Sequence, residues 1–191
     1  MKAEQKRRQE LIAATIREIG AEGTLNVTVS QIAKRAGVSP GLAFHYFGDK
    51  EQLFLATMRS ILRTYGALIR ANLVGKTEPV ERLTAILETN FSPSQFEDGA
   101  VAAWLNFYVL AQTSPEAQRL LALYHRRFHS NLVYSLRPLA GDAAHGIAER
   151  LGGLVDGLYL RFALNRSHVD PGPAVAQVLK ALEVELSALD G

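Results

Sequence analysis

The chain contains no cysteine, and this absence excludes three kinds of site at once. Without thiols there is no disulfide scaffold, no thiolate metal site and no cysteine nucleophile. Long apolar runs are absent as well: the longest, residues 100–111, is too short to span a bilayer and contains Asn106. The basic N-terminus is not followed by the apolar stretch of a secretory signal. We therefore expect a soluble, cytoplasmic protein with no membrane partner.

Residue patterns typical of enzymes are missing too. The sequence contains no evident nucleophile–base pair, metal constellation or phosphate-binding glycine loop, and Gly152-Gly153 lies within an expected helix. His125 and His129 have a spacing that can hold a metal on a helix, but the glutamate of the zinc-protease pattern and a third ligand are lacking. A solvated or interface face explains the two histidines better. The sequence predicts a protein that is not an enzyme and uses no metal and no cofactor.

The charge is distributed unevenly along the chain. The net charge is +2, yet residues 1–50 carry eight Lys and Arg against five Asp and Glu, a surplus of +3, while the other residues sum to −1. A basic first quarter on a nearly neutral body is typical of a polyanion-binding module joined to another domain. We expect the domains to be residues 1–50 and residues 51–191.

Almost every segment has the periodicity of a helix, and no segment alternates with the period of a strand. Glycines and prolines mark the ends of the segments, including a break from Pro138 to Asp142. We expect an all-α fold. Its helices are predicted to end near Gly20–Gly23 and then to cover 28–36, 39–47, 49–73, 79–91, 93–112, 115–137, 143–166 and 172–189.

Residues 28–47 have the plan of a helix-turn-helix. Thr28 and Gln31 have the spacing of a capping box, and Ser39-Pro40 combines a helix cap with a first-turn proline. Gly37 permits the left-handed backbone that a tight turn between helices requires. In such motifs the second helix enters the major groove of DNA with its N-terminal end. Corners of this kind also occur as plain structure in helical proteins, but here the corner coincides with the basic surplus.

The second helix of this motif offers specific DNA contacts. Ser39 and the amides near Gly41 can meet a phosphate or a base edge, because a helix N-terminus attracts anions. Gly41 has no side chain to hold the groove away. Tyr46 and Lys50 lie at the far end, where a hydroxyl and an ammonium can clamp the DNA backbone.

The stretch TVSQIAKRAGVSPG at 28–41, followed by HYFGDKEQL at 45–53, resembles the signature of TetR-type transcriptional repressors. The resemblance implies a helical homodimer with an N-terminal DNA-binding domain and a C-terminal domain for ligand binding and dimerisation. Where the family often has a tyrosine this chain has Phe44, which cannot donate to phosphate and is expected to meet a thymine methyl or to pack. The DNA contacts that the resemblance implies are Thr28, Ser39, Pro40, Gly41, Phe44, His45, Tyr46 and Lys50.

A narrower resemblance extends over most of the chain. The blocks AFHYFGDK at 43–50, ATMRSIL at 56–62, AWLNFY at 103–108, SNLVYSLRPL at 130–139 and LVDGLYLRFAL at 154–164 resemble the BetI-type branch, the choline-responsive repressors of glycine betaine synthesis. This resemblance implies a small effector such as choline or a related quaternary ammonium compound. A TetR-type regulator of efflux or catabolic genes with an unrelated hydrophobic ligand, a non-regulatory quaternary-ammonium binder and a transcriptional activator remain alternatives.

The second domain contains the parts of a quaternary-ammonium site. Such a cation is held by aromatic faces and a nearby carboxylate, because it cannot donate a hydrogen bond. Ordinary core packing is the alternative for each aromatic residue. For Asp156, which lies in an otherwise apolar stretch, the alternative is a buried salt bridge to Arg161, Arg126 or Arg127. The candidate ligand-binding residues are Phe91, Trp104, Phe107, Tyr108, Asp156 and Tyr159.

Two long segments near the C-terminus have an apolar excess that suits a twofold interface. In the family the matching helices pack against those of a second subunit as a four-helix bundle. The resemblance therefore implies a homodimer interface at Leu132, Leu136, Leu151, Leu154, Val155 and Leu158.

Overall fold

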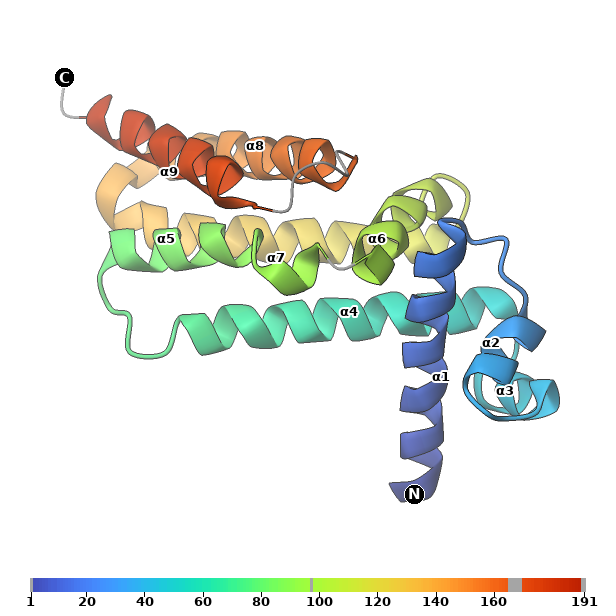
Figure 1. Cartoon of the computed structure of the whole chain (residues 1–191). Helices are drawn as coiled ribbons and strands as arrows, with labels where there is room; N and C mark the ends of the chain where they lie inside the picture. Colours follow the sequence, from blue (N-terminus) through green and yellow to red (C-terminus); the bar gives the residue numbers. More distant parts are fainter. Residues whose placement is uncertain (1, 97, 165–169, 190–191) are drawn as a thin grey trace. The chain divides into compact units, whose positions relative to one another are not determined.

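The computed structural model describes residues 2–96, 98–164 and 170–189, and within these ranges all regular structure is helical. The predicted all-α fold is confirmed. Figure 1 shows the order of the helices along the chain. They are α1 (Lys2–Glu22), α2 (Val29–Arg35), α3 (Pro40–Phe47), α4 (Lys50–Asn72), α5 (Pro79–Thr89), the 3-10 turn η1 (Pro93–Gln95), α6 (Asp98–Leu110), α7 (Pro115–Ala140), the 3-10 turn η2 (Gly141–Ala143), α8 (Ala144–Leu164) and α9 (Gly172–Ser187).

Two of the predicted boundaries differ from the structure. The helix expected over 93–112 is divided, because Pro93–Gln95 forms a 3-10 turn and α6 begins only at Asp98. The break expected at Pro138 does not occur, since α7 continues through it to Ala140. A proline in the last turn removes a single backbone donor close to the point where the helix ends anyway, so its cost there is small.

Packing divides the chain into two compact units. Unit 1 comprises residues 1–64 and 97–121, and unit 2 comprises residues 65–96 and 122–191. Both α4 and α7 run from one unit into the other along the chain. Unit 1 extends beyond the expected domain of residues 1–50 and includes a second stretch of the chain, because α6 packs on α1.

Unit 1 is built around α1, which packs on α2 and α6. Leu11 of α1, Ile32 of α2 and Phe107 of α6 are all completely buried. The closest approach lies at Gly99, where an added Cβ would stand 2.8 Å from Ile16 Cγ2 and 2.9 Å from the Ile16 carbonyl oxygen. Glycine is therefore required there for space.

Replacing Gly99 with alanine should destabilise the protein. The new methyl group would meet backbone as well as a side chain, and α1 would have to shift; we expect a loss of about 1–3 kcal/mol in the free energy of unfolding. Thermal and denaturant melts would measure the loss. Gly66→Ala is the control, since its Cβ would meet only Arg70 Nη1 at 3.5 Å, and alanine in an open helical position should stabilise slightly. Equal melting temperatures for the two variants would contradict this account of the α1–α6 contact.

Unit 2 has its own apolar core, drawn from the end of α4 and from α5, α7, α8 and α9. Helices α8 and α9 lie side by side in it. Within the described residues, no helix is both long enough and apolar enough to cross a membrane.

Candidate DNA-binding and effector sites

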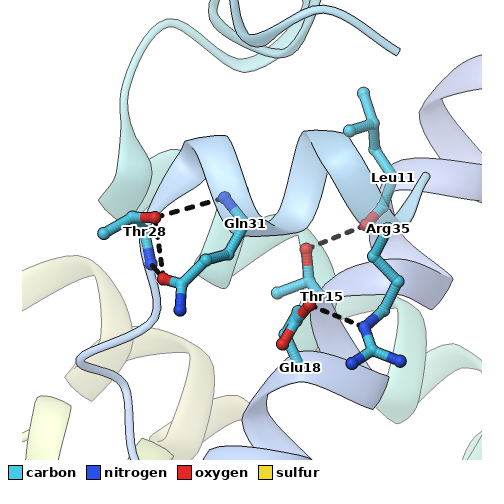
Figure 2. Close-up of polar contacts among 6 residues, drawn as sticks. All are labelled: Leu11, Thr15, Glu18, Thr28, Gln31 and Arg35. Atoms are coloured by element: carbon cyan, nitrogen blue, oxygen red, sulfur yellow. Dashed lines mark hydrogen bonds and ion pairs between the residues drawn. The ribbon is translucent and has the colours of Figure 1, made fainter. Parts of the chain in front are cut away.

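The helix-turn-helix begins with the predicted capping box. The Thr28 hydroxyl accepts a hydrogen bond from the Gln31 backbone N–H at 3.2 Å, and the Gln31 side-chain oxygen accepts one from the Thr28 N–H at 2.6 Å (Figure 2). Two backbone donors that the helix itself cannot satisfy are thereby satisfied. The start of α2 is fixed by local chemistry alone.

The turn between α2 and α3 depends on Gly37, whose φ is +68°. The Val38 N–H donates to the Ala33 carbonyl at 3.0 Å, which closes the C-terminus of α2. Ser39 then caps α3 by accepting from the Leu42 N–H at 3.2 Å, and Pro40 occupies the first turn. The predicted caps and turn are confirmed, and together they hold the N-terminus of α3 in one orientation.

Helix α3 buries one face and exposes the other. Ala43 and Phe47 are buried, whereas Gly41 and His45 are exposed and the Phe44 side chain remains 48% exposed. A large apolar ring left in water beside a helix N-terminus is available for contact with another molecule. The predicted DNA contacts Thr28, Ser39 and Pro40 are exposed as well, while Tyr46 and Lys50 are half-buried.

Helix α1 holds the motif through two charged contacts that sequence reasoning did not single out. Arg8 donates to the Tyr46 carbonyl oxygen, and its guanidinium carbon lies 4.6 Å from the centre of the Phe47 ring. Arg35 Nε donates to Glu18 Oε1 at 2.7 Å (Figure 2). This contact raises the pKa of the Arg35 guanidinium. Pairing across helices depends on their packing, so sequence spacing could not reveal these partners.

The start of α4 is anchored within the same unit. Asp49 caps it by accepting from the Gln52 N–H at 2.8 Å. Glu51 accepts from the Ser114 hydroxyl at 2.6 Å, and the Gln52 amide donates to Glu116 at 2.9 Å. Lys50 Nζ lies 5.3 Å from the centre of the Phe54 ring. Lys50 is thus placed on a helix whose first turn is fixed by the Asp49 cap and by hydrogen bonds to Ser114 and Glu116.

The predicted effector residues fall into two groups, one in each unit. In unit 1, the Trp104 ring lies 6.3 Å from Phe107 and 6.0 Å from Tyr108, measured between ring centres. Trp104 and Phe107 are buried and Tyr108 is partly buried. These three residues form one aromatic cluster on α6, as their helical spacing predicts.

In unit 2, Phe91 and Tyr159 are linked by a residue that the sequence reasoning missed. The Phe96 ring stacks on Phe91 at 6.3 Å and lies 5.1 Å from Tyr159. The Tyr159 hydroxyl donates to the Gln95 carbonyl at 2.9 Å. Phe96 follows the unexpected 3-10 turn, which explains why helical spacing alone could not place it beside the other two rings.

Asp156 is half-buried, and its partner is a histidine. Its side chain is 41% exposed, and Oδ2 lies 3.8 Å from Nε2 of His125. Among the residues that the structure describes, no ion pair joins Asp156 to an arginine, the predicted alternative. Burial raises the pKa of the Asp156 carboxyl, while the charge of His125 acts in the opposite direction.

Two further tyrosines gather near Asp156. The Tyr65 ring lies 5.7 Å from Tyr124, whose own ring lies 5.3 Å from His125. Tyr65 donates to the Asn90 side-chain oxygen at 2.8 Å. Burial, together with the Asp156 carboxylate, raises the pKa of Tyr65. Tyr65 and Tyr124 come from α4 and α7, so only the tertiary structure could bring them to the carboxylate on α8.

The predicted dimer-interface residues lie largely in the core of the protomer. Leu132, Leu136, Leu151, Val155 and Leu158 are all buried in unit 2, and Leu154 packs against this core. These five side chains are buried by the protomer's own helices, and an interface at these positions stays a prediction. Exposed apolar side chains occur elsewhere on α8, where Leu160 is 44% and Leu164 is 65% exposed.

The two histidines with metal-binding spacing have different neighbours in the structure. Within the described ranges, no group of three or more His, Asp or Glu residues is placed to hold a metal ion. His125 faces Asp156, whereas the His129 ring lies 5.5 Å from that of His145.

Two family models match the chain. Residues 11–57 match the tetR family of bacterial regulatory proteins. Residues 79–187 match the C-terminal domain of BetI-type transcriptional repressors. The first match covers the helix-turn-helix and the start of α4, and the second covers most of unit 2 together with α6.

Similar proteins and solved structures agree with these matches. The HTH-type transcriptional regulators BetI from Brucella canis and Brucella anthropi are 50% and 52% identical over 182 residues, covering 95% and 94% of this chain and 92% and 93% of theirs. A transcriptional regulator from Pseudomonas aeruginosa has a TM-score of 0.84 at 25% identity, over 96% of this chain and 91% of its own. A regulator from Saccharomonospora viridis, solved in complex with choline, has the same TM-score at 19% identity, over 94% and 96% of the two chains. The chain belongs to the BetI-type transcriptional repressors of the TetR family.

Proposed function

We propose that this ligand-responsive repressor reads its operator with the exposed face of α3. The observation that carries the proposal is the fixed, capped N-terminus of α3, with Gly41 and Phe44 exposed beside it. Ser39 and the first amides of α3 would contact phosphate, and Phe44 would contact a thymine methyl. Thr28, Pro40, His45, Tyr46 and Lys50 would complete the contacts.

A homodimer would present two such helices to successive major grooves, about 34–36 Å apart. Support for a twofold contact comes from α8, where Gly153, Gly157, Leu160 and Leu164 recur at helical spacing and are all exposed. A Cβ at either glycine would meet nothing within 4 Å, so another helix could approach closely. We therefore propose that this strip of α8, rather than the buried leucines, meets the second subunit.

Replacing Leu160 with arginine should convert the dimer into a monomer. An unpaired guanidinium buried in an apolar interface costs several kcal/mol, and a twofold interface would contain it twice. Light scattering after size exclusion should then give the mass of one 20.9 kDa chain rather than two. Leu123→Arg is the matched control, as Leu123 is 38% exposed on α7. A dimeric Leu160→Arg variant would place the interface elsewhere.

For the effector we propose choline or a closely related quaternary ammonium compound. The regulator from Saccharomonospora viridis that was solved with choline supplies the chemical precedent. In this chain, Asp156 with Tyr65, Tyr124 and Tyr159 offers a carboxylate and aromatic rings within one unit. The predicted cluster of Trp104, Phe107 and Tyr108 belongs to unit 1 and stays a separate prediction.

Release from DNA requires that the effector prefer one arrangement of the dimer. A ligand shifts such an equilibrium only by its difference in affinity for the two states, which typically amounts to about 1–3 kcal/mol. Helix α4 is suited to transmit the change because it runs from Lys50 in unit 1 past Tyr65 in unit 2. A tyrosine near the effector carboxylate and a DNA contact thus belong to a single helix.

A gel-shift experiment tests the proposed function as a whole. The purified protein should retard the DNA upstream of its own gene, and added choline should release it. Ethanolamine is the control, since it has the same hydroxyl and a primary ammonium that prefers water. Failure to retard DNA at low salt would contradict operator binding, and equal release by both compounds would contradict quaternary-ammonium recognition.

A further inference from the structure

Unit 2 contains a pocket that lies apart from the residues proposed for the effector. Its volume is about 920 Å³, within the range of small-molecule sites. The connector after α4, the start of α5, the second half of α7 and the first turn of α8 supply its walls. None of the aromatic residues proposed to hold choline lines it.

The lining of the pocket is strongly cationic. Lys76, Arg82 and Arg137 contribute three permanent positive charges, and His129 and His145 add two imidazoles. The lining contains no aspartate or glutamate. In the part of the chain that the structure describes, none of the three permanent cations forms an ion pair with a carboxylate. Elsewhere in unit 2, by contrast, the charge of Arg150 is neutralised by an ion pair with Glu185.

Arg82 is held in position without its charge being neutralised. Its Nη1 donates to the Lys76 carbonyl at 3.1 Å, and its guanidinium carbon lies 5.2 Å from the centre of the Tyr134 ring. Its Nε is buried and has no hydrogen-bond partner among the described residues. A carbonyl and a ring orient the guanidinium but leave its full charge at the pocket wall.

Helices α7 and α8 supply the remaining basic residues of the lining. Arg137 Nη2 lies 3.5 Å from Nε2 of His145, and the rings of His129 and His145 are 5.5 Å apart. Grouping the permanent cations Lys76, Arg82 and Arg137 raises the free energy of the pocket without an anion, and an anion placed among them lowers it. Guanidinium groups in particular match the oxygens of carboxylate and phosphate.

We propose that this pocket binds a small, multiply charged oxyanion, that is, a molecule carrying phosphate or carboxylate groups. A quaternary ammonium compound would be repelled here, so the anion and the proposed effector would occupy different sites of the same unit. The inference does not depend on choline recognition or on operator binding, because it rests only on the lining of this pocket.

Calorimetric titration of the full-length protein tests the proposal, with inorganic pyrophosphate and citrate as probes at constant ionic strength. We expect saturable binding of at least one probe with one site per chain, and the stronger probe would identify phosphate or carboxylate as the preferred group. Arg137→Gln should weaken binding at least about tenfold, because it removes a charge-assisted contact. Arg137 is exposed, so the fold should tolerate the change.

Arg82→Gln provides a second variant, checked by its thermal melt, and should weaken binding to a similar extent. Arg126→Gln is the matched control: it removes the same charge from an exposed position of α7 outside the pocket. The proposal is overturned if neither probe saturates. It is equally overturned if Arg126→Gln weakens binding as much as Arg137→Gln. Binding would then depend on the overall positive charge of the chain and not on this pocket.

Discussion

Replacing Gly41 with glutamate should remove most operator binding while leaving the fold at least as stable as before. Gly41 lies in the first turn of α3, and a Cβ there would meet nothing within 4 Å. Exchanging glycine for a residue with a side chain favours the helix, and an acidic group in its first turn interacts well with the helix dipole. Folding is therefore not threatened.

Binding should respond in the opposite direction. The new carboxylate would stand where α3 is proposed to approach phosphates and base edges, adding bulk and like charge together. Each such contact is worth about 1–3 kcal/mol, so we expect operator affinity to fall about 100-fold. Fluorescence anisotropy with labelled operator would measure the loss, and a thermal melt would measure stability.

The control for Gly41→Glu is Ala71→Glu. It makes the same change in net charge at an exposed position of α4, far along the sequence from the reading helix. Operator affinity of this variant should stay within about twofold of the parent protein, because screened distant charges contribute little. If both variants lost affinity equally, net charge rather than the face of α3 would govern binding.

The second large effect is expected at Asp156. Asp156→Asn keeps the shape of the side chain but removes the charge that would face a quaternary ammonium. The carboxylate is half-buried, so its attraction is screened only in part; we expect choline affinity to fall about tenfold. Calorimetry with choline measures the change, and Asp142→Asn in η2, an exposed position, is the control.

The same site predicts a dependence on pH. Burial raises the pKa of the Asp156 carboxyl, so this carboxyl becomes protonated at a higher pH than an exposed aspartate does. Choline affinity should accordingly fall as the pH is lowered into the acid range, because the protonated carboxyl no longer attracts the cation. Tyr65, whose pKa is raised, stays neutral throughout this range. Asp156→Asn should flatten the profile; an unchanged profile would remove Asp156 from the effector site.

The helix-turn-helix could be predicted from the sequence almost completely, because its geometry depends on neighbours along the chain. Thr28 and Gln31 close their capping box across three residues, Ser39 caps its own helix, and Gly37 supplies the one left-handed turn. Interactions of this range need no knowledge of the remaining fold. Whether Phe44 packs or stays exposed was left open by the sequence, and the structure leaves it 48% exposed.

The effector region could be predicted only in part. Helical spacing correctly grouped Trp104, Phe107 and Tyr108 on α6. It could not bring Tyr65 and Tyr124 to Asp156, or Phe96 between Phe91 and Tyr159, since these contacts join residues from different helices. It could offer only arginines as alternative partners for Asp156, where the structure has His125.

By itself, the sequence determined the all-α class, the caps and turn of the DNA-reading motif and the absence of thiol chemistry, because each follows from composition or short-range spacing. The tertiary structure alone decided which apolar residues of α7 and α8 are core and which remain exposed. An apolar stripe is equally suited to a core and to an interface, and only the packing of neighbouring helices distinguishes Leu158 from Leu160. The cationic pocket was decided in the same way, since Lys76, Arg82 and Arg137 come together only when the connector after α4, α5 and α7 pack in one unit.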